Sequence, residues 1–207
     1  MASTASPYGL RAVNELGGLP YAGSTRSLAF DPAGYGANVY NGSLVYVKTT
    51  GYIEIVTATG ADATTNGFPV GTANTGAVGV FVGCSYVNAQ GQTVFSQYYP
   101  SGSLNAVAFV IDDDRTVFQV QSAGSVTIAA LGANTFFSTS AVATGSTTTG
   151  NSTASVVVGS SAVTTTAAFR IVGFVNKQGF STVGDAYTDI LVKFNPGYHS
   201  YSNAVGL

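Results

Sequence analysis

The sequence is poor in the residues that build most catalytic and metal centres. It has one cysteine, one histidine, one methionine and no tryptophan, and only 8% of its 207 residues are charged, against about 25% in ordinary globular proteins. One cysteine and one histidine exclude a multi-thiolate zinc site and a disulfide framework. Seven basic residues and a net charge of -2 are poorly suited to neutralising a nucleic-acid backbone. We expect no nucleic-acid partner, no cofactor and no resident metal.

Apolar side chains are abundant but are never continuous over a long stretch. Hydrophobic residues make up 45% of the chain, with 12 tyrosines and 12 phenylalanines, whereas disordered chains combine low hydrophobicity with high net charge. Glycine, serine and asparagine interrupt every apolar run before the roughly 18 residues that a membrane span needs. Residues 1–7 contain no basic residue and no apolar run, so we expect no secretory signal and synthesis in the cytoplasm. A folded chain without a membrane partner is predicted.

Short β-branched and aromatic segments, separated by turn residues, predict an all-β fold. Residues 78–87 and 93–99 read as one hairpin, and residues 106–111 and 116–121 as a second one with a tight Asp112–Arg115 turn. The glycines within 78–87 indicate a bulge or a close backbone contact, and a short helical turn fits near residues 125–131. The number and spacing of strands predict an antiparallel β-sandwich or a jelly-roll-like barrel. Further strands are expected at residues 44–48, 52–56, 155–158, 169–175 and 190–194.

The first 36 residues differ from the rest. They are rich in glycine, proline and tyrosine without sustained periodicity, so we expect strands to begin only near Asn38. We divide the chain into an irregular N-terminal arm or loop layer, residues 1–36, and a single β-sandwich domain, residues 37–207. Within that domain the Ser/Thr/Gly-rich stretch 138–166 is expected to form a long irregular loop, interrupted by the strand at 155–158.

The scarcity of charge bears on assembly. Apolar strands with few charges have little to stop their edges from pairing with other chains. A free monomer of this composition would be prone to aggregation, whereas neighbours in an assembly would cover its edges and apolar faces. The composition therefore favours an oligomer or a component of a larger shell.

Three features carry candidate chemistry. The acidic run Asp112–Asp114 has the oxygen ligands of a calcium site, but consecutive residues of an extended chain point apart and Asp suits turns; the sequence favours the turn and leaves cation binding open. Catalysis by His199 would need a nucleophile and an orienting acid, and no motif supplies them, so a packing role is expected. Cys84 lies in an apolar run and reads as a small buried hydrophobe. We expect no enzyme activity.

The order of several motifs resembles a group of tailed-bacteriophage structural proteins, the head decoration or capsid cement proteins. The resemblance starts with Ser-Pro-Tyr-Gly-Leu-Arg-Ala-Val at residues 6–13 and a Gly/Pro-rich stretch, and covers most of the chain. The further segments that carry it are residues 78–86, 97–100, 112–121, 131–134, 144–150 and 169–173.

This resemblance implies a β-sandwich or barrel-like subunit, commonly a homotrimer, that binds the major capsid protein on the outer surface of the virion head and reinforces the shell. The irregular composition of residues 8–30 suggests that they supply part of the capsid or intersubunit contact, with Tyr8, Leu10 and Arg11 as anchors. The competing reading is a receptor- or glycan-binding β-domain of a tail fibre or spike, because tyrosine-rich loops also suit a host surface glycan. An enzyme such as a glycan hydrolase ranks last.

Overall fold

The structure is a computed structural model that describes residues 4–57, 76–138, 143–157, 168–176 and 181–202. In these residues it has twelve β-strands, two short 3-10 turns and no α-helix. The expectation of an all-β chain is confirmed. The elements are β1 (Arg11–Glu15), β2 (Arg26–Ala29), β3 (Leu44–Val47), β4 (Ile53–Ile55), β5 (Gly79–Val87), β6 (Thr93–Ser96), β7 (Leu104–Ile111), β8 (Thr116–Gln121), η1 (Ile128–Ala130), β9 (Asn134–Phe137), β10 (Val156–Val157), β11 (Phe169–Phe174), β12 (Asp189–Phe194) and η2 (Pro196–Tyr198).

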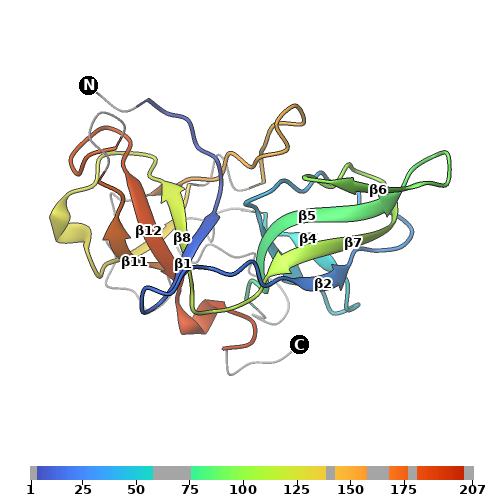
Figure 1. Ribbon diagram of the computed structural model, residues 1–207, viewed down its shortest axis with the longest axis horizontal. Coiled ribbons are helices and arrows are strands. Elements are labelled where there is room, and N and C mark those ends of the chain that lie inside the picture. Colours follow the sequence, from blue (N-terminus) through green and yellow to red (C-terminus); the bar gives the residue numbers. More distant parts are fainter. Residues whose placement is uncertain (1–3, 58–75, 139–142, 158–167, 177–180, 203–207) are drawn as a thin grey trace.

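The strands form two open antiparallel sheets. The first has the order β1-β8-β12-β11-β9-β10, and the second has the order β2-β7-β5-β3-β4, with β6 added to β5. Figure 1 shows the first sheet on the left and the second on the right, with β1 in front. Neither sheet closes on itself, so of the two forms expected, the structure takes the sandwich-like one with two packed sheets and not the barrel.

The first expected hairpin is confirmed. β5 and β6 pair antiparallel, with Ser85 opposite Phe95, and a hydrogen bond from the Asn88 amide to the Gln92 carbonyl oxygen closes the turn. The close backbone contact predicted for this strand is present at Gly79, where a Cβ atom would lie 2.1 Å from the Ile111 carbonyl oxygen. The bulge is present as well, as a register shift between Phe81 and Gly83.

The second expected hairpin is wrong. β7 and β8 lie in different sheets, since β7 pairs with β5 and β2 whereas β8 pairs with β1 and β12. Both strands are flanked on each side by other strands, which satisfy their backbone hydrogen bonds and leave no edge for mutual pairing. The residues between them, Asp112–Arg115, therefore carry the chain from the second sheet to the first.

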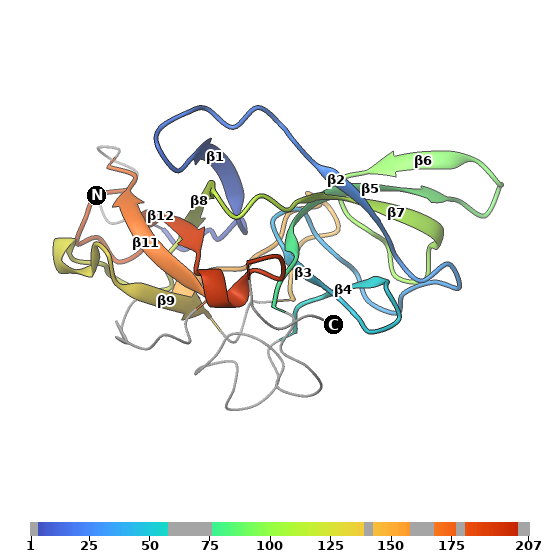
Figure 2. The same cartoon turned by 90° about the horizontal axis from the view of Figure 1, so that it is seen from below.

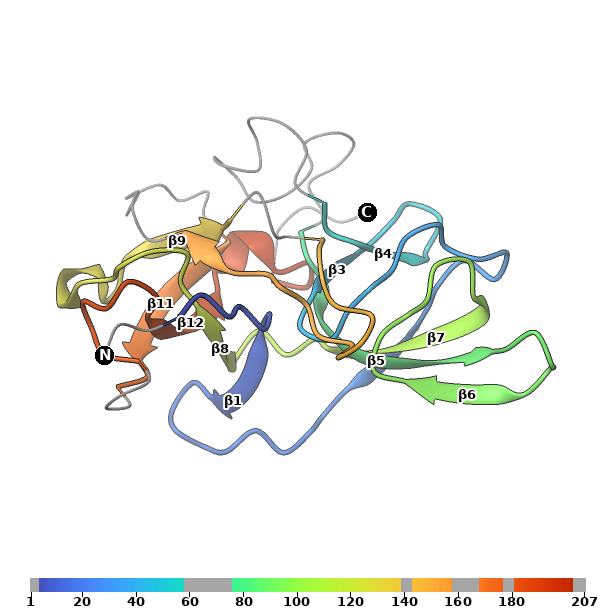
Figure 3. The ribbon, with the colours of Figure 1, turned by 90° about the horizontal axis from the view of Figure 1, so that it is seen from above.

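The expectation that strands begin near Asn38 is also wrong. β1 and β2 both lie within the first 36 residues, and each forms an edge of one sheet: β1 pairs with β8, and β2 with β7. Figures 2 and 3 show the connection between them passing from one sheet to the other along a single side of the molecule. Short, half-exposed edge strands lack the apolar alternation by which sequence periodicity is recognised.

One hydrophobic cluster joins the sheets. Leu44, Val80 and Ile111 of the second sheet share it with Phe118 and Phe169 of the first. A second cluster lies within the second sheet and its loops, where the rings of Phe30 and Tyr99 stack 4.2 Å apart. Because the first cluster crosses the junction, burial of apolar surface holds the sheets together.

Candidate functional site

The three residues expected to make intermolecular contacts lie close together but differ in accessibility. Leu10 is 2% exposed and belongs to the hydrophobic cluster that joins the sheets. Its side chain therefore has no surface to offer a partner. Tyr8 is half-buried and Arg11 is exposed, so these two remain available.

Tyr8 and Arg11 form a stacked pair at the start of β1. The Arg11 guanidinium carbon lies 4.9 Å from the centre of the Tyr8 ring, a cation–π distance. Burial raises the pKa of the Tyr8 phenol above its ordinary value, and the nearby Asp189 carboxylate raises it further. The phenol therefore keeps its proton over the physiological pH range.

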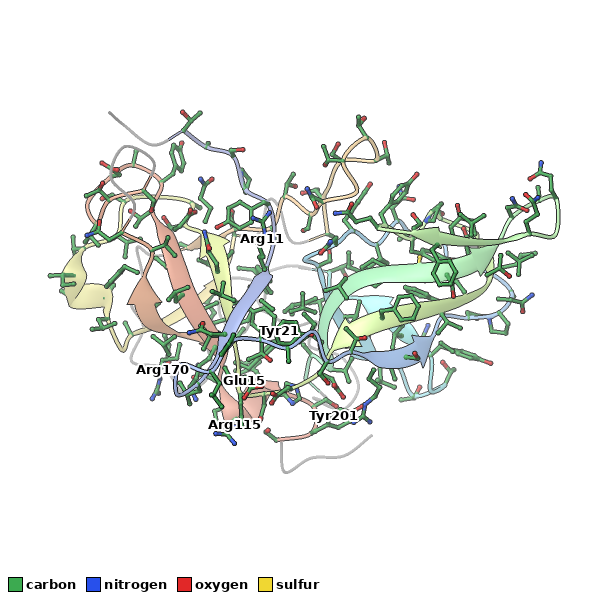
Figure 4. The ribbon with its side chains drawn as sticks, in the orientation of Figure 1. Arg11, Glu15, Tyr21, Arg115, Arg170 and Tyr201 are labelled. Atoms are coloured by element: carbon green, nitrogen blue, oxygen red, sulfur yellow. The ribbon has the colours of Figure 1, made fainter. Side chains whose placement is uncertain are left out.

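A groove of about 390 Å³ opens beside this pair, between the two sheets. Its volume falls in the usual range for ligand pockets, about 300–1,000 Å³. Figure 4 shows Arg11 and Tyr21 along the line where β1 faces the second sheet. The lining combines apolar, aromatic and amide side chains from both sheets and their loops: Tyr8, Leu10, Arg11, Ala12, Tyr21, Asn41, Val82, Gln97, Ile111 and Asn151.

At the opposite end of β1, residues 15–19 form what we call the leucine loop. The Glu15 amide donates a hydrogen bond to the Leu19 carbonyl oxygen at 2.7 Å, and the Gly18 amide donates to the Glu15 carbonyl oxygen at 3.0 Å. Gly17 and Gly18 have φ angles of +115° and +88°, which glycine adopts readily. The Leu16 amide also donates to the Arg115 carbonyl oxygen at 2.8 Å. Hydrogen bonds thus hold the loop both internally and to the residue that precedes β8.

The leucine loop presents apolar side chains to solvent. Leu16 is 44% exposed and Leu19 is 66% exposed, and Val13, at the bulge in β1, is 42% exposed. From the sequence we expect a contact within residues 8–30 with Tyr8, Leu10 and Arg11 as anchors, and Leu16 and Leu19 are not singled out. The signal for the exposed loop is the pair of leucines on either side of two glycines, which indicates a turn with apolar residues at its ends.

A second exposed apolar site lies on the second sheet. Phe95 of the edge strand β6 is 76% exposed, and its ring stacks on that of Phe109 at 6.4 Å. Phe95 pairs with Ser85, while Phe109 pairs with the neighbouring Gly83. An aromatic pair at this edge suits contact with another protein surface.

The acidic run is a turn whose carboxylates take separate partners. Asp112 forms an ion pair with Arg26, the Arg115 amide donates to Asp113 at 2.9 Å, and the Ser202 hydroxyl donates to Asp114. The run ends in a turn, as expected, but the turn joins two sheets and is not the hairpin turn that the sequence suggested. Within the residues that the structure describes, no group of three or more His, Cys, Asp or Glu side chains is arranged to hold a metal ion.

His199 and Cys84 are both interior residues. His199 is 1% exposed, and the Tyr201 amide donates to its Nδ1 at 3.4 Å. Burial lowers the pKa of His199, although the carboxylates of Asp112–Asp114 act in the opposite direction. Burial raises the pKa of the Cys84 thiol to about 12, so this cysteine is a packing residue as expected.

No protein-family model, curated protein or solved structure matches the chain. In the described ranges, the structure contains no helix with the length and hydropathy of a membrane span.

Proposed function

We propose that the chain is a structural capsid decoration protein, which binds the outside of a phage head as a homotrimer and stabilises the shell without enzymatic activity. The observation that carries the proposal is the leucine loop. Two leucines are held in solvent by a hydrogen-bonded turn, within residues 8–30, whose irregular composition suggested a contact region. Exposed apolar side chains of this kind mark protein interaction sites.

The capsid contact in this proposal is small for each chain, and trimerisation makes it strong. Three copies of one loop attach together, so the second and third contacts form at high effective concentration. The Arg115 carbonyl oxygen accepts the Leu16 amide, and the loop itself contains Glu15, so charged residues of both signs adjoin the apolar tip in the chain. We expect the leucines to enter an apolar site on the major capsid protein.

The trimer contact in this proposal uses the Phe95–Phe109 pair. Among the described residues β6 pairs only with β5, so its other edge is free. A second copy that covered Phe95 would remove both an unpaired strand edge and a large exposed ring. The wild-type protein should then have three times the 20.9 kDa chain mass in light scattering after size-exclusion chromatography, and Phe95→Ser should shift it toward the monomer.

The attachment test changes the loop and leaves the fold intact. Removing residues 1–25 would also delete β1 and the core residue Leu10, so point changes are preferable. The double variant Leu16→Ser/Leu19→Ser should remain trimeric and lose at least tenfold in occupancy on heads that lack the protein, measured by co-sedimentation.

The matched control is Ile128→Ser/Leu131→Ser, which removes a second pair of exposed apolar side chains, 66% and 53% exposed. Its occupancy should equal that of the wild type. An equal loss in both variants would mean that general surface hydrophobicity drives attachment, and unchanged occupancy of the Leu16/Leu19 variant would remove the basis of the proposal.

A second candidate function is a receptor- or glycan-binding domain of a tail fibre or spike. The groove favours it, because amide and tyrosine side chains converge there beside an apolar floor. The two functions differ in location on the particle: a decoration protein covers the icosahedral shell, whereas a tail protein occupies one vertex.

A further inference from the structure

The groove has a floor and a rim of different chemistry. Leu10 and Ile111 are almost fully buried beneath it, and the partly exposed Ala12 and Val82 supply its accessible apolar surface. The rim carries the amides of Asn41, Gln97 and Asn151 together with two tyrosines. A pyranose ring has the same division, with apolar C–H faces and polar hydroxyls around its edge.

The amides are held in place while keeping hydrogen-bonding capacity. The Gln97 side-chain nitrogen donates to the Asn151 side-chain oxygen at 2.9 Å, which leaves the Gln97 oxygen and the Asn151 nitrogen for a ligand. The backbone of Asn41 is fixed by hydrogen bonds with Gly150 and Ser152. Among the described residues, none forms a hydrogen bond with the side-chain amide of Asn41. Planar amides of this kind offer a donor and an acceptor to neighbouring hydroxyls.

The lining itself carries one charge, and the Asp189 carboxylate lies near its Tyr8 side. Arg11 is the single charged residue in the lining, which contains no carboxylate. Neither ion pair found among the described residues, Arg26–Asp112 and Lys48–Glu54, involves Arg11. Its guanidinium is already oriented by the Tyr8 ring, and an oriented guanidinium binds a carboxylate through two parallel hydrogen bonds.

We propose that this groove binds an acidic saccharide, with its carboxylate on Arg11, its hydroxyls on the amides of Asn41, Gln97 and Asn151, and a ring face over the apolar floor. The ligand class is an oligosaccharide that contains a uronic or sialic acid. The proposal rests on the groove and deepens the second candidate function, and its test measures ligand binding wherever the protein lies on the particle.

The test compares matched acidic and neutral probes. The full-length protein is titrated with trigalacturonic acid and sialyllactose, and with galactotriose and lactose as their neutral counterparts, while backbone amide NMR shifts are recorded. At least one acidic probe should bind at least fivefold more tightly than its neutral counterpart, with shifts at Arg11, Asn41 and Gln97. Binding of neither acidic probe, or equal binding of both members of each pair, would overturn the proposal.

Variants separate the two parts of the site. Arg11→Gln should abolish the preference for the acidic probe, because only the carboxylate contact is lost. Asn41→Ala should weaken the acidic and the neutral probe alike. Gln90→Ala is the control, since it removes an exposed amide from the β5–β6 turn, outside the groove lining, and its affinities should match the wild type. An Arg11→Gln protein that folds normally and keeps the acidic preference would contradict the assignment.

Discussion

The β5–β7 seam and the leucine loop both depend on glycine, for opposite reasons. At Gly79 the two strand backbones touch, and an added Cβ atom would meet the Ile111 carbonyl oxygen at 2.1 Å. At Gly17 and Gly18 no atom lies within 4 Å of an added Cβ, and glycine is needed only for its positive φ. The seam brings β5 and β7 into contact, whereas the loop projects leucines outward. The first serves the fold, and in our proposal the second serves an encounter with a partner.

The largest expected effect is at the seam. Gly79→Ala forces a methyl group against backbone atoms on the neighbouring strand, and such overpacking costs about 3 kcal/mol. Chemical denaturation should show this loss in the free energy of unfolding. Gly36→Ala is the matched control, because Gly36 has open space and an ordinary φ; it should change stability by less than about 0.5 kcal/mol. A loss of the same size in both variants would contradict the close contact.

The second effect concerns His199, which is buried near the segment Asp112–Asp114 that connects the two sheets. Burial lowers the pKa of His199. A histidine whose folded pKa lies below its unfolded value of about 6.5 contributes its full stability above that pH. The contribution falls as the pH drops toward the folded pKa, by at most about 1.4 kcal/mol per pH unit. Unfolding measured between pH 7.5 and 5 should show this slope in the wild type and a smaller slope in His199→Gln. Equal slopes would assign the effect to other groups.

The third effect is smaller. Arg26 pairs with Asp112 while its guanidinium lies 5.0 Å from the centre of the Tyr201 ring. It thereby connects β2, the crossover between the sheets and the C-terminal segment. Because Arg26 is more than half exposed, solvent screens the ion pair, and Arg26→Ala should lower the free energy of unfolding by about 1 kcal/mol. The measurement is thermal unfolding at low and high salt; the loss should shrink at high salt, and a loss independent of salt would point to packing alone.

The smallest effect on stability belongs to the leucine loop. Leu16→Ser/Leu19→Ser exchanges two exposed side chains, so the free energy of unfolding should change by less than about 0.5 kcal/mol. Chemical denaturation at fixed protein concentration measures this. A loss of 2 kcal/mol or more would mean that these leucines serve the fold, and the contrast with the seam would disappear.

Sequence reasoning was most successful where strands are central and apolar. The 78–87 strand, its hairpin and its tight glycine were all predicted, because β-branched residues, turn residues and glycine lie within a few positions of each other. The 106–111 and 116–121 strands were found but wrongly paired. Short spacing favours a hairpin, while the choice of partner depends on β2 and β12, which lie far away in the sequence.

The groove was not predicted from the sequence. Tyr8 and Arg11, expected as contact residues, line it, and its other walls come from residues such as Asn41, Gln97 and Asn151, which only the folded chain brings together. Leu10 was expected to be an anchor and is a core residue. Composition alone cannot separate these roles, because an apolar residue next to a strand serves a core or an interface equally well.

The most direct test of the account is the position of the protein on the particle. Gold-labelled antibody against the chain, applied to intact particles that carry it, should label the whole surface of the head, and this labelling should be lost with Leu16→Ser/Leu19→Ser. Label confined to a single vertex would contradict the decoration role and favour the tail-fibre alternative.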